Sequence, residues 1–577
     1  MMLKSFKNFI SLLIFLSAIS ILKAEDQIDI WKDKKKDLNT KEVTENNSIE
    51  KSNSSINQNS LKIENVSEIK EGSLNYEASK VFGVYDPADY NFNINMWSST
   101  NAEDVRSSVK RLKKIKLSKT SNDIFENILL SFSYPPVGMS EKEFVNLKIN
   151  WLIENDRSEL IESFLKQNKD FPGKSKAVQY LVDEKITQAN IKEGCEKIEF
   201  IDSTIKDSYL EKFKIYCLVF ENKKSEARLL LDLLREQNQS DKFFDDKINF
   251  LLGISDKTTK KINEKNLLNF YLSSVTIKDF NYEPNKKTKK EIWKYLNAAN
   301  LIKLDDFSDK EKIRELELAS NQGQVDSGLI FNIYKQITFD LNSLINAKNI
   351  YQSLENVDSR ALIYQKYLLS EDLNSKFENL FLLENLFLKD GLSNIYNEFL
   401  DRSVRNIGLE KIPEKYKEIS LKIILKEENS NSGKVKYNDK ILHQSKIIRF
   451  YLENVSEKKI QKEIDRTFKK LSKNKKYFFS AKDLALAETL IKDGFKIPTN
   501  FKLNELTSKY DVPKNLFNLI EKKQNAFLAL KIVEIIGEDE PHELDPETIY
   551  FITNLLNETN LITIRNKVLI SALPLRV

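Results

Sequence analysis

The chain has 577 residues, of which 41% are hydrophobic and 31% are charged, the balance of a globular protein. Its 13 glycines and 11 prolines are too few for the many tight turns of a β-rich fold, so the composition favours helices joined by short polar turns. The formal net charge of +5 is close to neutral for this length, which argues against the strongly basic surface of a typical nucleic-acid-binding protein.

The first residues have the three parts of an export signal. Two lysines are followed by the apolar stretch 9–22 and by a cleavage site that ends at Ala24. This stretch is shorter than the roughly 20 residues that span a bilayer comfortably. We therefore expect residues 1–24 to be a signal peptide, cut before Glu25, and the chain to be exported to the periplasm. The alternative is an uncleaved N-terminal anchor in the inner membrane.

Two segments of different composition follow the signal. Residues 25–78 are rich in Lys, Asn, Ser, Glu and Asp, with too little apolar surface to offset the entropy of ordering them, so we predict a disordered linker. Residues 79–100 hold closely spaced aromatic side chains, and we predict an extended strap whose aromatic residues fill grooves between helices. The alternative is an aromatic platform that binds a ligand. The aromatic residues of the strap are Tyr85, Tyr90, Phe92 and Trp97.

From residue 101 onward, apolar residues repeat at steps of three or four, the pattern of helices with one buried face. The polar breaks between them are short, so neighbouring helices should run antiparallel. No fixed repeat period is present. We predict an all-α fold, an irregular α-solenoid of stacked antiparallel helical hairpins. Its parts are a helical-repeat region at 101–428, a flexible loop at 429–438 and a C-terminal helical region at 439–577.

Three short patterns predict where helices begin. The sequences at 100–103 and 140–143 have the spacing of capping boxes, with Thr100 and Ser140 as the capping residues. Asp545 followed by Pro546 is a typical start for a further helix, because proline is well suited to the first helical position.

The two cysteines, Cys195 and Cys217, lie on consecutive apolar stripes. We expect the first helix to end near Asp207 and the next to begin near Ser208. At about 1.5 Å per residue, both cysteines then lie at nearly the same height on antiparallel helices. Export to an oxidising compartment would favour a disulfide between them. The alternative is two unrelated buried thiols.

The sequence contains no recognisable catalytic, cofactor-binding or metal-binding pattern. There is no glycine-rich phosphate loop and no nucleophile motif of the G-x-S-x-G type. The two histidines, His443 and His542, are far apart in the sequence, and we expect structural or surface roles for both. We therefore predict no cofactor and no metal site.

Several short landmarks resemble, in their order, a little-characterised family of exported bacterial helical-repeat proteins. The resemblance implies a helical fold and export, and no established activity. A helical ring also precedes the catalytic domain of soluble lytic transglycosylases, but neither that compact C-terminal domain nor its Glu-Ser motif with a following Gly-Leu-Met-Gln is found in this sequence. The landmarks are MWSST at 96–100, GC at 194–195, YC at 216–217, LLLDLLRE at 229–236 and ELELASNQGQV at 315–325.

These patterns together predict a non-enzymatic periplasmic scaffold that binds a protein or peptide partner through its helical surface. Neither a nucleic-acid partner nor a membrane span in the mature chain is expected. The alternative is a cell-wall-associated protein that binds or cleaves peptidoglycan.

Overall fold

The computed structural model describes residues 80–202, 205–304, 306–428, 434–453, 455–498 and 514–576, together with 501, 503 and 507. The predicted signal peptide with its cleavage site at Ala24 and Glu25, and the predicted linker at 25–78, lie outside the described residues. So does the first half of the predicted loop at 429–438.

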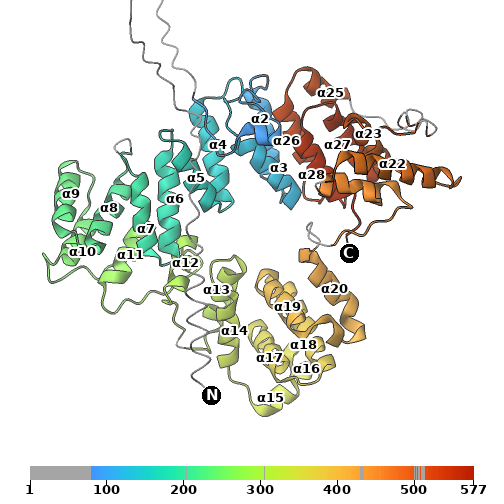
Figure 1. Cartoon of the computed structure of the whole chain (residues 1–577). Helices are drawn as coiled ribbons and strands as arrows, with labels where there is room; N and C mark the ends of the chain where they lie inside the picture. Colours follow the sequence, from blue (N-terminus) through green and yellow to red (C-terminus); the bar gives the residue numbers. More distant parts are fainter. Residues whose placement is uncertain are drawn as a thin grey trace, which may run out of the picture. The chain divides into compact units, whose positions relative to one another are not determined.

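The described part of the chain is all-α, as predicted, and its only β pairing consists of isolated bridges (Figure 1). The helices in the first half are α2 (Ala102–Leu112), α3 (Lys119–Leu130), α4 (Glu141–Glu154), α5 (Ser158–Gln167), α6 (Lys174–Thr187), α7 (Ile191–Glu196), α8 (Ser208–Phe220), α9 (Lys224–Glu236), α10 (Lys242–Leu252), α11 (Leu267–Thr276) and α12 (Lys290–Ala298).

Consecutive helices pack on one another along most of the chain, which is the solenoid-like arrangement expected from the short breaks. The later helices are α13 (Lys310–Asn321), α14 (Ser327–Gln336), α15 (Leu341–Ile345), α16 (Ala347–Ile350), α17 (Asn356–Leu369), α18 (Leu373–Lys389), α19 (Ser393–Ile407), α20 (Glu414–Glu428), α21 (Arg449–Leu452), α22 (Glu457–Ser472), α23 (Ala481–Lys492), α25 (Lys514–Glu521), α26 (Asn525–Ile536), α27 (Pro546–Asn557) and α28 (Ile562–Ala572). Among the described residues, no helix is both long and apolar enough to cross a membrane.

Buried apolar side chains form two clusters. One draws on residues 82–296 and 442–573, and the other on residues 293–416. The first cluster joins segments that are far apart in the sequence because α26 packs against α2 and α3. At this junction the Ser118 N–H donates to the carbonyl oxygen of Gly537 at 3.0 Å. The predicted division into a repeat region and a C-terminal region stays a prediction.

The N-terminal strap is anchored by buried polar groups. Phe82 and Tyr85 form single bridges with residues 133 and 131, and a 3-10 helix follows at Pro87–Tyr90. The Lys148 ammonium is buried and donates to the carbonyl oxygens of Phe82 at 2.7 Å and Ser131 at 2.9 Å. A Cβ at Gly83 would lie 2.5 Å from the backbone nitrogen of Phe132, so only glycine fits there.

The helix starts agree with the sequence patterns at two of three places. The Ser140 side chain accepts a hydrogen bond from the Glu143 N–H at the start of α4. Asp545 caps α27, and Pro546 is the first residue of that helix. The expectation for Thr100 was wrong. The capping side chain of α2 is Asn101, which accepts from the Glu103 N–H, because Thr100 is one residue too early and its side chain is buried.

Candidate functional site

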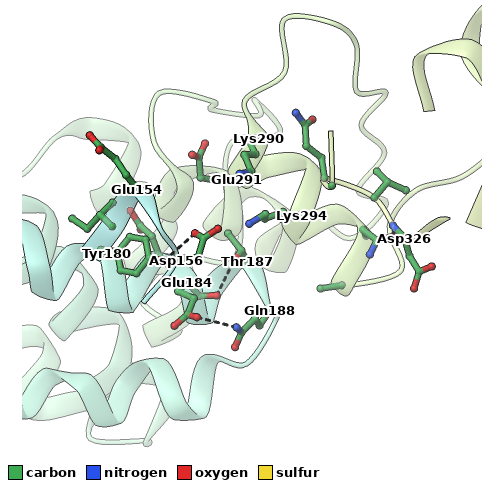
Figure 2. A pocket seen from close by; sticks show the side chains of 17 residues that line it. Glu154, Asp156, Tyr180, Glu184, Thr187, Gln188, Lys290, Glu291, Lys294 and Asp326 are labelled. Atoms are coloured by element: carbon green, nitrogen blue, oxygen red, sulfur yellow. Dashed lines mark hydrogen bonds between the residues drawn. The ribbon is translucent and has the colours of Figure 1, made fainter. Parts of the chain in front are cut away.

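A hollow of about 750 Å³ lies where four segments meet. They are the end of α4, the outer face of α6, the exposed face of α12 and the turn between α13 and α14. Figure 2 shows side chains of α6 and α12 converging on this space. We call it the acidic hollow. Its lining residues are Ile153, Glu154, Asp156, Tyr180, Asp183, Glu184, Thr187, Gln188, Lys290, Glu291, Lys294, Asn297, Ala298, Gly323, Gln324, Val325 and Asp326.

The local sequence explains why polar groups face this space. The apolar residues of α12 repeat at helical spacing and are buried, so the intervening Lys290, Glu291 and Lys294 are left on the open side. In α6 the buried stripe includes Leu181, Val182 and Ile186, which leaves the adjoining polar stripe facing the hollow.

Carboxylates outnumber lysines in the lining by six to two. Some have partners within the chain. Glu154 accepts from Lys113 at 2.9 Å, and Asp156 accepts from the Tyr180 hydroxyl at 3.1 Å. One oxygen of Glu184, Oε2, is buried without a hydrogen-bond partner among the described residues. The hollow therefore has an excess of hydrogen-bond acceptors and of negative charge. The six acidic residues are Glu154, Asp156, Asp183, Glu184, Glu291 and Asp326.

Asp183 gives the hollow a charge that depends on pH. Burial raises the pKa of its carboxyl to about 7, and the negative charge of Glu291 adds to the rise. Hydrogen bonds from the Tyr209 hydroxyl and the Gln179 amide oppose it. Since Asp183 loses its proton near pH 7, the hollow becomes more negative as the pH rises through that value.

The aromatic residues predicted for the strap lie elsewhere, and none is part of this lining. Trp97 is 2% exposed and packs edge-on against Phe144, with ring centroids 6.4 Å apart. Phe92 is also buried, whereas Tyr85 and Tyr90 are half-buried and contact each other. The Tyr85 hydroxyl donates to Glu126 at 2.8 Å.

A disulfide joins Cys195 and Cys217, whose Cα atoms are 5.5 Å apart. The expected helix around Cys195 was wrong in its length. Cys195 lies in the last turn of the six-residue helix α7, and a 3-10 helix at Lys197–Phe200 and a loop lead to α8. The two cysteines approach because α7 packs beside α8, not because two long helices share a register.

His443 is held by a carboxylate distant in the sequence. Its Nδ1 lies 2.7 Å from Asp483, which also accepts from the Tyr477 hydroxyl at 2.8 Å. Burial raises the pKa of Asp483, but the hydrogen bonds and charge of His443 outweigh this and lower it on balance. Asp483 also completes the capping box of α23, so these contacts fix a helix start. His542 is exposed.

Neither local pattern nor composition indicated the acidic hollow, because its lining comes from three separate stretches of sequence, 153–188, 290–298 and 323–326. Within the described ranges, no group of three or more His, Cys, Asp or Glu side chains is placed to hold a metal ion. No family model, curated protein or solved structure matches this chain.

Proposed function

We propose that the chain is a non-enzymatic periplasmic helical-repeat scaffold that binds a protein or peptide segment in the acidic hollow. The observation that carries this proposal is the hollow itself: a space of about 750 Å³ whose lining combines an excess of carboxylates with amide and hydroxyl groups. Groups of this kind accept hydrogen bonds from Lys and Arg side chains and from peptide N–H groups. The segment bound there is therefore basic.

The periplasmic location in this proposal is supported by the signal-like sequence at 1–24 and by the disulfide, because disulfides persist in oxidising compartments. Affinity capture with cross-linking in the native periplasm tests both the location of the protein and the identity of its partner. A photoreactive residue at Thr187, in the hollow, should cross-link a partner that one at Lys257, an exposed residue that is not part of the lining, does not. Equal cross-linking at both positions would argue against the hollow.

The chemistry of the segment can be tested with synthetic peptides of equal length that carry either Lys or Glu at alternate positions. We expect only the lysine peptide to bind, and Glu184→Gln with Glu291→Gln to weaken binding by roughly 1 kcal/mol per charge. The matched control is Glu398→Gln, on the exposed surface of α19.

The pH dependence of binding is a separate test. Binding of the lysine peptide to the wild type should strengthen as the pH rises through about 7, and binding to Asp183→Asn should not change in this way. Preference for the glutamate peptide would contradict the proposal.

A second proposal is a cell-wall-associated protein that binds or cleaves peptidoglycan. It is favoured by Asp183, because a carboxyl with a pKa of about 7 on the wall of a large hollow can donate a proton to a glycosidic oxygen. Incubation with purified peptidoglycan decides between the two. Released fragments that disappear with Asp183→Asn would support cleavage, whereas sedimentation without release would support binding alone.

A further inference from the structure

The end of α22 and the turn after it present an unusual density of positive charge. Between Asp465 and Asp483 the sequence contains no acidic residue. Five lysines in this interval are exposed, and together with the exposed Phe478 we call them the basic tip. It consists of Lys469, Lys470, Lys473, Lys475, Lys476 and Phe478.

Almost all of this charge is unneutralised. Lys470 lies 3.3 Å from Asp439, which Arg466 also approaches at 3.6 Å. In the part of the chain that is described, no ion pair engages the other four lysines of the tip. Lys440 and Lys446 add to the same surface, since they line a hollow of about 500 Å³ together with Lys470. The tip therefore attracts an anionic surface.

Phe478 is the most exposed large apolar side chain of the described chain, at 78%. Its neighbours point inward. The Tyr477 hydroxyl donates to Asp483, and the Phe479 ring packs edge-on against Phe501 with centroids 5.5 Å apart. These two anchors hold the turn so that the ring between them projects into solvent. An exposed aromatic ring that follows a run of exposed lysines in the sequence suits a membrane surface, whose outer layer is anionic and whose interior is apolar.

We propose that the basic tip docks on the surface of an anionic lipid bilayer, with its lysines at the headgroup phosphates and Phe478 inserted at the boundary of the acyl chains. The tip uses lysine throughout, whereas recognition of nucleic-acid phosphates and bases favours the planar fork of arginine. It also offers one exposed ring and no row of rings on which successive bases could stack. Charge complementarity and the projecting ring together favour the bilayer over a soluble polyanion.

The test measures binding of the full chain to vesicles of phosphatidylcholine alone and to vesicles that also contain phosphatidylglycerol. We expect binding only to the anionic vesicles, and weaker binding as salt is added. The triple variant Lys473→Gln, Lys475→Gln, Lys476→Gln should bind roughly a hundredfold more weakly, at about fivefold per lysine. Its matched control changes three exposed lysines elsewhere, Lys257→Gln, Lys260→Gln and Lys261→Gln, and should bind within about twofold of wild type.

Insertion of the ring is tested separately. Phe478→Ala should weaken binding roughly tenfold, whereas Ile254→Ala, at another exposed apolar residue, should not. In Phe478→Trp the added fluorescence should shift to the blue on anionic vesicles and be quenched by brominated lipid. Because all substituted side chains are exposed, thermal unfolding should be unchanged. Equal binding to both kinds of vesicle, or lysine-dependent binding to heparin with no effect of Phe478→Ala on vesicles, would overturn the proposal.

Discussion

At the scale of single residues, Lys148 shows how a buried charge ties stability to pH. Burial lowers the pKa of its ammonium from 10.5 to about 7. Between these values the unfolded chain holds one proton more than the folded chain, so the free energy of unfolding rises with pH in this window and is lowest below it.

We therefore expect the wild type to gain about 3 kcal/mol of stability relative to Lys148→Met between about pH 7 and about pH 9.5. Urea unfolding of both chains at the two pH values measures this difference. Lys142→Met, at an exposed position of the same helix, is the control and should show no such change. A difference between wild type and Lys148→Met that does not vary with pH would show that Lys148 keeps its proton throughout.

Arg360 tests the opposite case, a buried charge with partners. Its guanidinium is 2% exposed and binds Glu317 through Nη2 at 2.6 Å and Nε at 3.2 Å, and it also pairs with Asp390. We expect Arg360→Leu to lower the free energy of unfolding by about 3–5 kcal/mol, because Glu317 would stay buried without a cation. Chemical denaturation measures the loss.

Two further variants make this experiment specific. Adding Glu317→Gln to Arg360→Leu should restore part of the stability, since no uncompensated charge then remains in the core. Arg402→Leu removes an exposed partner of Glu398 and should cost less than about 1 kcal/mol. If Arg360→Leu were no more harmful than Arg402→Leu, the buried network would contribute little to folding.

At the scale of elements, the disulfide holds a short helix of the first apolar cluster in place. Helix α7 has six residues, too few to be stable alone, and the bond ties it to α8 across 22 residues of sequence. The double variant Cys195→Ser, Cys217→Ser should lose roughly 3 kcal/mol of stability. Hydrogen exchange should show the loosening mainly in residues 191–202.

The bond itself is checked by mass spectrometry of the non-reduced, alkylated protein. We expect neither cysteine to be alkylated, and the mass of the chain to be two hydrogens lower than that of the reduced chain. Two alkylated cysteines in freshly isolated material would contradict the disulfide and remove one argument for export.

At the scale of the whole described chain, Glu540 tests the junction between α3 and the turn that follows α26. Its carboxylate accepts from the Thr120 hydroxyl at 2.6 Å and from the Thr120 N–H at 3.3 Å. We expect Glu540→Ala to cost about 1–2 kcal/mol, because the Thr120 side chain is buried. In this variant, the backbone amides of residues 118–130 and of residues 537–545 should exchange their hydrogens faster than in the wild type. The control, Glu558→Ala, removes an exposed ion pair with Lys492 and should leave residues 118–130 unaffected.

What the sequence alone determined is local. The apolar spacing of three and four residues predicted the all-α fold, and short polar patterns predicted the starts of α4 and α27, because helix formation and capping depend on residues within about one turn of each other. The error at Thr100 was a shift of one residue between two side chains that can both cap.

What only the tertiary structure decided depends on contacts between distant residues. The acidic hollow combines α6 with α12, and His443 meets Asp483 across 40 residues. The lysines of the basic tip are visible in the sequence. The sequence does not show that Tyr477 and Phe479 point inward and leave Phe478 exposed. No local pattern specifies such neighbours, because each helix carries a buried face that many partners can satisfy, and the packing of all of them together selects one arrangement.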